Sequence, residues 1–108
     1  MHNLDSLLRI MRRLRDPDQG CKWDMAQTYD TIVPHTIEEA YEVADAIERQ
    51  DYQSLKDELG DLLFQIVFYS QLGQEHSTFN FDDVVQGICE KMIRRHPHIF
   101  KASEPTTN

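Results

Sequence analysis

Five carboxylates stand in two short groups in this sequence, and their types and spacing could bind a divalent metal ion. The first group is Glu38-Glu39-x-x-Glu42 and the second is Glu58-x-x-Asp61. Both groups fall in stretches with helical periodicity, where residues three or four positions apart lie on one face. Like charges at this spacing repel by about 0.2–0.5 kcal/mol per pair on an isolated helix. A cation would offset that repulsion, and oxygen ligands favour Mg²⁺ or Mn²⁺ over zinc.

These carboxylates could instead have a purely structural role. Acidic residues on helices often form a solvated face, and the chain carries a formal net charge of −8. Glu39 could also complete a capping box with Thr36 at the start of a helix. Against a solvated face, Glu58 and Asp61 adjoin an apolar run, and a helix with such a run must be largely buried. The residues of this run are Leu59, Leu62, Leu63, Ile66 and Val67.

The composition indicates a small acidic domain rather than a membrane protein or a protein that binds duplex nucleic acid. A chain of 108 residues can form one domain with a modest core, and its negative charge disfavours a large nucleic-acid footprint. No apolar stretch is long enough to cross a membrane. The two cysteines, Cys21 and Cys89, form neither a zinc-binding nor a disulfide pattern. We therefore expect a reduced, cytoplasmic protein.

The elements that must position the two groups are predicted to be four helices, which makes the fold all-α. The helices are expected at about residues 4–14, 36–49, 52–72 and 81–95, with Thr28 capping a further short segment before Pro34. Asp51 and Asn80 are candidate N-caps of the last two helices. A loop through Trp23 joins the first helix to the rest. The polar tail, residues 101–108, is expected to be disordered.

The apolar faces of the two middle helices predict a core and a second buried surface. The core stripe of the helix at 36–49 is expected to be Ile37, Ala40, Tyr41, Ala44 and Ile47. The core stripe of the next helix is expected to be Leu55, Leu59, Leu62 and Ile66. Its opposite side carries Phe64, Phe68 and Leu72. Because a helix that is apolar all round must be buried on two sides, we expect a homodimer that forms through it, the alternative being a lone apolar patch on a monomer.

The last helix combines an apolar stripe with basic residues. The stripe consists of Val84, Val85, Ile88 and Met92. Lys91 and Arg95 lean toward this stripe by helical angle and lie one turn apart. They could bind an anion, although cations near a helix C-terminus are also favoured by the helix dipole.

Four motifs together resemble the MazG-like nucleoside triphosphate pyrophosphohydrolases, within the wider group of all-α NTP pyrophosphatases. The motifs cover about residues 4–100, so the resemblance implies a single domain at 1–100. They are Gly20-Cys21-x-Trp23-Asp24 with Gln27-Thr28, Glu38-Glu39-x-x-Glu42, Glu58-Leu59-Gly60-Asp61-Leu62-Leu63-Phe64, and Arg94-Arg95-His96-Pro97-His98-x-Phe100.

The resemblance also implies an activity and a four-helix fold that dimerises and can assemble further into a tetramer. The expected reaction is the Mg²⁺-dependent hydrolysis of a nucleoside triphosphate to the monophosphate and pyrophosphate, with a role in cleaning the nucleotide pool. The expected metal ligands are Glu39, Glu42, Glu58 and Asp61. Glu38 would assist the metal or position the attacking water. Lys91 and Arg95 would neutralise phosphate oxygens, and Trp23 would either stack on the base or cover the core.

Some residues favour an alternative in which the chain is a weakly active or non-catalytic dimerisation or partner-binding domain. Active members often carry Asn and Lys at the positions of Cys89 and Ser54. The Arg-Arg-His-Pro-His ending is similar to the first half of two-repeat members, in which activity can reside mainly in the other half. His96 and His98 could touch substrate or could simply cap the helix end.

Overall fold

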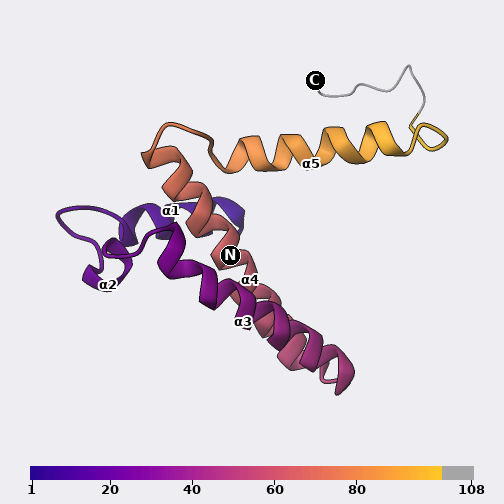
Figure 1. Ribbon diagram of the computed structural model, residues 1–108, viewed down its shortest axis with the longest axis horizontal. Helices are drawn as coiled ribbons and strands as arrows, with labels where there is room; N and C mark the ends of the chain where they lie inside the picture. Colours follow the sequence, from indigo (N-terminus) through magenta and orange to yellow (C-terminus); the bar gives the residue numbers. More distant parts are fainter. Residues whose placement is uncertain (101–108) are drawn as a thin grey trace.

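The computed structural model describes residues 1–100 of the chain, which form five α-helices (Figure 1). The helices are α1 (Leu4–Leu14), α2 (Lys22–Met25), α3 (Tyr29–Glu48), α4 (Tyr52–Glu75) and α5 (Phe81–Arg95). No strand occurs in this part of the chain, so the predicted all-α class is confirmed. None of the five helices is long and apolar enough to cross a membrane. The predicted disordered tail lies outside the described residues.

The longer helices begin at polar residues whose side chains accept hydrogen bonds from the first helical turn. Asn3 caps α1, and the predicted caps Thr28, Asp51 and Asn80 cap α3, α4 and α5. Such caps satisfy backbone N–H groups that have no partner inside the helix. The helix starts therefore follow from local sequence.

The helix α3 differs from the prediction because it begins at Tyr29 and continues through Pro34. A proline this near the helix start removes only one hydrogen bond, and the cap at Thr28 has already fixed the start. Thr36 consequently lies inside α3, where its hydroxyl oxygen is 3.3 Å from the carbonyl oxygen of Ile32. The interpretation of Thr36 and Glu39 as a capping box is therefore wrong.

The short helix α2 lies in a region predicted to be a loop. Four residues are too few to show helical periodicity in a sequence, so this helix could not be recognised by its pattern. Its backbone amide at Met25 bonds to the carbonyl of Cys21 at 2.8 Å. Trp23 is part of this helix.

The hydrophobic core lies where α1 and α3 pack against the C-terminal half of α4. Figure 1 shows α3 and α4 side by side, with α1 near the C-terminal part of α4. The buried core residues are Met11, Ile32, Val67, Phe68 and Leu72. These residues join three helices that are distant in sequence, so the core fixes how α3 lies on α4.

The structure reverses the predicted core face of α4. Phe68 and Leu72, which were expected on the outer side, are each 1% exposed. Leu59 and Ile66, which were expected in the core, are 48% and 39% exposed. Because α4 is apolar on both sides, periodicity alone cannot tell which side meets the rest of the chain.

The predicted core stripe of α3 is also wrong for a single chain. Tyr41 is 72% exposed, and Ile37 and the other members of the stripe lie on the surface too. The face of α3 that packs on α4 carries Thr36 and Glu39 in place of a continuous apolar stripe. The apolar stripe in the sequence of α3 therefore marks the outer face of this helix and not the face that packs on α4.

The helix α5 extends away from the other helices at the C-terminal end of α4 (Figure 1). It contains no buried residue within the described chain. Its apolar residues Val84, Val85 and Ile88 are exposed by 39%, 39% and 48%. The connection to α5 packs closely on α4, because a Cβ atom at Gly73 would lie 2.7 Å from the Phe79 ring.

Candidate functional site

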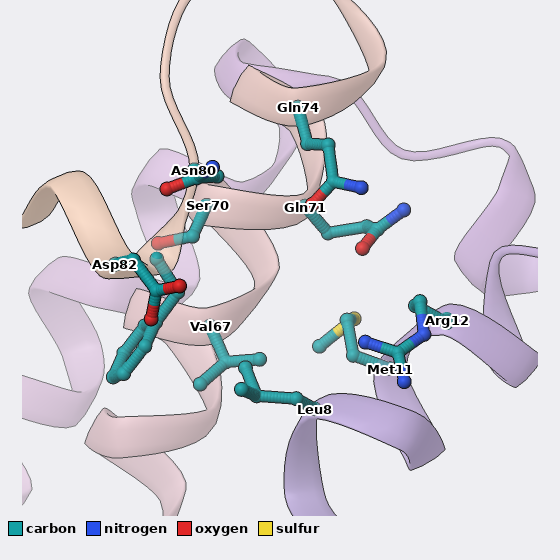
Figure 2. Close-up of a pocket in the computed structure, with 10 residues that line it drawn as sticks. Leu8, Met11, Arg12, Val67, Ser70, Gln71, Gln74, Asn80 and Asp82 are labelled. Carbon is teal, nitrogen blue, oxygen red and sulfur yellow. The ribbon is translucent and has the colours of Figure 1, made fainter. Parts of the chain in front are cut away.

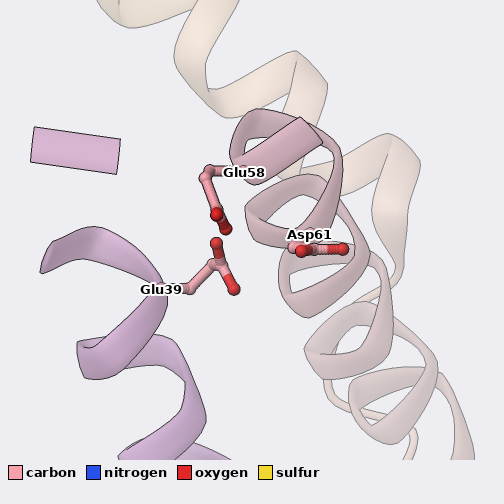
Figure 3. Close-up of side chains that lie close together, drawn as sticks. All are labelled: Glu39, Glu58 and Asp61. Carbon is pink, nitrogen blue, oxygen red and sulfur yellow. The ribbon is translucent and has the colours of Figure 1, made fainter. Parts of the chain in front are cut away.

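Glu39 of α3 and Glu58 and Asp61 of α4 form a compact cluster of carboxylates. One carboxylate oxygen of each residue lies within 4.8 Å of the others. Figure 3 shows Glu39 and Glu58 pointing toward each other across the space between the two helices. The structure thus brings members of both predicted acidic groups to one place.

The register of α3 against α4 is fixed by polar contacts next to the cluster. The hydroxyl oxygen of Thr36 lies 2.6 Å from that of Tyr69 and 3.1 Å from Oε1 of Gln65. Thr36 and Glu39 are almost one turn apart on α3, and Gln65 and Asp61 are about one turn apart on α4. The contact at Thr36 therefore places Glu39 opposite the acidic group of α4.

The second constraint lies at the turn between the two helices. Arg49 donates to Asp45 at 2.9 Å and to Asp51 at 3.2 Å. Asp51 also accepts a bond from the backbone of Ser54 and so caps α4. The turn at Gln50 has a positive φ of 57°. These contacts link the end of α3 to the start of α4.

The electrostatics of the cluster are unfavourable when all three carboxylates are ionised. Burial raises the pKa of Glu39 to about 7, with further contributions from a hydrogen bond to Glu58 and from the charges of Glu58, Asp61 and Glu42. Among the described residues, Oε2 of Glu39 is the buried side-chain oxygen that has no hydrogen-bond partner. A proton or a cation at this position would relieve the repulsion.

The donor set fits a hard divalent cation. All the nearby ligand atoms are carboxylate oxygens, which Mg²⁺ and Mn²⁺ prefer. Within residues 1–100, the ion pairs join Arg15 to Glu75 and Arg49 to Asp45 and Asp51, so no arginine or lysine neutralises the cluster. The buried oxygen without a partner also suits a metal ligand.

The other two carboxylates of the first group lie beside the cluster rather than in it. Glu38 and Glu42 are exposed on α3. The charge of Glu42 contributes to the raised pKa of Glu39, so the two side chains are electrostatically coupled. The predicted roles of Glu38 as an assisting group and of Glu42 as a ligand stay predictions.

Trp23 is an exposed residue next to the start of α3. The residue is 55% exposed, which does not fit the alternative of a core cover. Its ring meets the ring of His35 edge to face, with centroids 6.0 Å apart. His35 precedes Glu39 by four residues and so lies on the same side of α3. None of the sequence motifs singles out His35, although its spacing from Glu39 is a usable signal.

The predicted anion-binding residues, Lys91 and Arg95, are exposed on α5. Because α5 leaves from the opposite end of α4, a single chain does not bring them to the cluster (Figure 1). Their contact with phosphate stays a prediction. Nδ1 of His96 lies 2.7 Å from the carbonyl oxygen of Met92, which agrees with a capping role.

A separate cavity of about 120 Å³ lies between α1, α4 and the start of α5 (Figure 2). None of the predicted site residues lines this cavity. The lining residues are Leu8, Met11, Arg12, Val67, Ser70, Gln71, Gln74, Asn80, Phe81 and Asp82. The hydroxyl of Ser70 already donates to the carbonyl of Ile66, so the cavity offers no free buried donor there.

Known proteins similar to this chain share the region that contains the cluster. Residues 27–100 match the MazG nucleotide pyrophosphohydrolase domain. The chain is 56% identical over 103 residues to a protein of Escherichia coli (strain K12) named nucleoside triphosphate pyrophosphohydrolase, covering 95% of this chain and 39% of that protein. It is 45% identical over 96 residues to the Thermotoga maritima nucleoside triphosphate pyrophosphohydrolase/pyrophosphatase MazG, covering 89% and 37%.

A more distant relative is the Mycobacterium tuberculosis nucleoside triphosphate pyrophosphohydrolase, which is 34% identical over 79 residues, covering 71% of this chain and 24% of that protein. The chain spans about two fifths of the length of the first two relatives. The matched residues include the whole of α3, α4 and α5, and hence all three members of the cluster. The chain therefore belongs to the MazG nucleotide pyrophosphohydrolase family.

Proposed function

We propose that the chain hydrolyses nucleoside triphosphates, of ribose or deoxyribose, to the monophosphate and pyrophosphate, and so helps to clean the nucleotide pool. The observation that carries this proposal is the cluster of Glu39, Glu58 and Asp61, with its buried unpartnered oxygen, in a MazG family chain. The names of the E. coli and T. maritima relatives support the reaction.

Glu39, Glu58 and Asp61 would hold Mg²⁺, for which Mn²⁺ could substitute, and Glu42 would join them from the next turn of α3. Bound Mg²⁺ would neutralise phosphate oxygens and lower the pKa of a coordinated water. Because its pKa is raised to about 7, Glu39 would release its proton when it holds the metal near neutral pH.

The remaining residues would orient the reactants. Glu38 would accept a hydrogen bond from the water that attacks the α-phosphorus and would take its proton. The bond from the α-phosphorus to the bridging oxygen would break, and its electron pair would leave with pyrophosphate. Trp23 would stack on the base, and Lys91 and Arg95 would bind phosphate oxygens.

The active form is proposed to be a homodimer, which could pair further into a tetramer. Large side chains on the outer faces of α3 and α4 are exposed in the single chain, and they include Tyr41, Leu59, Leu63 and Ile66. Monomers seldom expose large apolar patches of this kind. The interface would form from these residues and not from Phe68, which the core already buries. A second chain would also cover α5 and could bring its basic residues to the cluster.

The test is to incubate the purified protein with ribo- and deoxyribonucleoside triphosphates, with Mg²⁺ or with EDTA, and to measure pyrophosphate and orthophosphate separately. We expect pyrophosphate only when Mg²⁺ is present, and its rate should rank the substrates. Orthophosphate as the main product, or equal rates with EDTA, would contradict the proposal. Glu39→Gln is the matched inactive control.

The second candidate is a weakly active or non-catalytic domain that binds a partner or a second copy. Two observations favour it. The chain spans 39% of the E. coli relative. The hydroxyl of Ser54 donates to Asp51 at 2.8 Å and so serves the start of α4, at a position where active members of the family often carry a lysine. Nucleotide binding in calorimetry without pyrophosphate release would favour this candidate.

A further inference from the structure

Arg15 is a nearly buried arginine that joins three segments of the chain. Its side chain is 7% exposed, and its guanidinium lies 5.6 Å from the centre of the Phe68 ring. Nε and Nη2 donate to the two carboxylate oxygens of Glu75, at 3.0 and 2.5 Å. Nη1 donates, at 2.6, 3.3 and 3.1 Å, to the backbone carbonyl oxygens of Asp24, Met25 and Gln27.

The chemistry of these contacts is specific to arginine. Its planar guanidinium can face a carboxylate with two donors and still direct a third toward other acceptors. A buried guanidinium is costly unless its donors are satisfied, so its position is strongly determined. Since Glu75 belongs to α4 and the carbonyls belong to the end of α2, Arg15 fixes α2 relative to α4.

The segment that Arg15 fixes carries Trp23. The carbonyl oxygen of Trp23 accepts a hydrogen bond from Nε2 of Gln27 at 2.9 Å, so this residue belongs to the held segment. Trp23 is nevertheless 55% exposed, and its ring makes an edge contact with His35. A large apolar ring that is exposed on a firmly held backbone is well placed to meet a ligand.

The position of His35 relates this aromatic pair to the cluster. His35 lies four residues before Glu39 and seven before Glu42, so the three residues share one side of α3. Four residues correspond to about 6 Å along the helix. Trp23 and His35 therefore lie about one turn from the proposed metal ligand, on the side toward the start of α3.

We propose that Arg15 is a positioning residue for nucleotide binding, because it holds Trp23 against His35 and so forms a corner for the base beside the carboxylate cluster. The base stacks on the indole face, His35 meets the edge of the base, and the triphosphate extends toward Glu39. This inference rests on the proposed function for its ligand. Arg15 itself touches no substrate.

The test compares Arg15→Met with Glu75→Gln and His35→Ala. Methionine keeps an apolar contact with Phe68 but removes every donor. The matched control is Arg13→Met, because Arg13 also lies near the end of α1 but is exposed and forms none of the ion pairs found within residues 1–100. For each protein, KM and kcat are measured with Mg²⁺ and a nucleoside triphosphate. Inhibition by inorganic tripolyphosphate, which has no base, is measured alongside.

Arg15→Met and His35→Ala are expected to raise KM about fivefold or more, which is the loss of a modest base-stacking contact. Inhibition by tripolyphosphate and kcat should change less than about twofold, because the cluster is intact. Glu75→Gln should shift KM in the same direction by less, and Arg13→Met should not shift it. An unchanged KM in Arg15→Met and His35→Ala, or an equal loss of tripolyphosphate binding, would overturn the proposal.

Fluorescence reports directly whether the base of the nucleotide contacts the indole of Trp23. Trp23 is the single tryptophan of the sequence, so its emission reports this site alone. A nucleoside triphosphate should quench the emission of the wild type, and tripolyphosphate should not. In fluorescence anisotropy, Glu75→Gln should show faster local motion of the indole than the wild type. If Arg15→Met does not fold, Glu75→Gln and His35→Ala decide the question. Quenching by nucleotide without turnover would reject the proposed reaction but keep this inference, and no quenching would reject the inference.

Discussion

Replacing Glu39 by glutamine is expected to stabilise the metal-free protein at pH 8, although it removes a proposed metal ligand. Burial, followed by the hydrogen bond to Glu58 and the neighbouring charges, raises the pKa of Glu39 from 4.5 to about 7. The folded chain therefore holds this proton more tightly than the unfolded chain does. The resulting stability is present at low pH and is lost as the pH rises from about 4.5 through about 7. A glutamine at this position does not titrate, so it causes no loss of stability over that pH range.

The size of the effect follows from the pKa shift. One pKa unit corresponds to about 1.4 kcal/mol, so the full shift would correspond to about 3 kcal/mol. The cluster is partly open to solvent, and screening reduces the expected difference to about 1–2 kcal/mol. The free energy of unfolding of Glu39→Gln should exceed that of the wild type by this amount at pH 8, and the two should nearly agree at pH 4, below the pKa of Glu39 in both the folded and the unfolded chain.

Urea unfolding in EDTA at both pH values measures this difference. The protein concentration must be the same throughout, because association would add its own stabilisation. Glu48→Gln is the control, since Glu48 is an exposed carboxylate of the same helix, and its effect should stay within about 0.5 kcal/mol at both pH values. A Glu39→Gln protein that is less stable than the wild type at pH 8 would refute the reasoning, because the carboxylates would then not repel one another.

Metal binding, turnover and assembly should respond in related ways. Binding of Mg²⁺ at pH 6 should release about one proton per ion, because Glu39 is protonated at that pH, and binding at pH 8.5 should release almost none. Calorimetric titrations in buffers of different ionisation enthalpy measure this release. Equal release at both pH values would contradict the prediction. Glu42→Gln and Asp61→Asn should each reduce pyrophosphate release to background while the circular dichroism spectrum stays unchanged. Undiminished hydrolysis in both variants would remove the metal assignment. Leu63→Glu, on the exposed apolar side of α4, should turn a dimer into a monomer in light scattering, and a wild type that is monomeric at micromolar concentration would refute the dimer.

The helix starts could be predicted from the sequence because the contacts that define them are local. Thr28, Asp51 and Asn80 each accept a bond from a backbone amide three residues later. The predicted start of α3 is nevertheless too late, because Pro34 is typical of a break in a helix. One missing hydrogen bond near a well-capped start is insufficient to end a helix of 20 residues.

The faces of the helices could not be predicted because they depend on contacts between distant residues. Both sides of α4 are apolar, and only the packing with Met11 and Ile32 selects Phe68 as the core side. The position of α2 depends likewise on Arg15, whose donors reach its carbonyls from the end of α1. Neither choice is encoded in the periodicity of a single helix.

The candidate site was predictable in outline but not in detail. The spacing of Glu58 and Asp61 correctly placed both on one face of a helix. Which member of the first group faces them depends on the rotation of α3, which the contact between Thr36 and Tyr69 fixes. That rotation selects Glu39 and leaves Glu42 exposed, although both fit the sequence pattern equally well.

In the proposed reaction, the chain directs water to the α-phosphorus of a nucleoside triphosphate at a metal held by the cluster. Hydrolysis in water labelled with ¹⁸O, with Mg²⁺ present, tests it most directly when the products are analysed by mass spectrometry. The label should appear in the nucleoside monophosphate and not in pyrophosphate. Label in the pyrophosphate, or no turnover in the presence of Mg²⁺, would contradict the account.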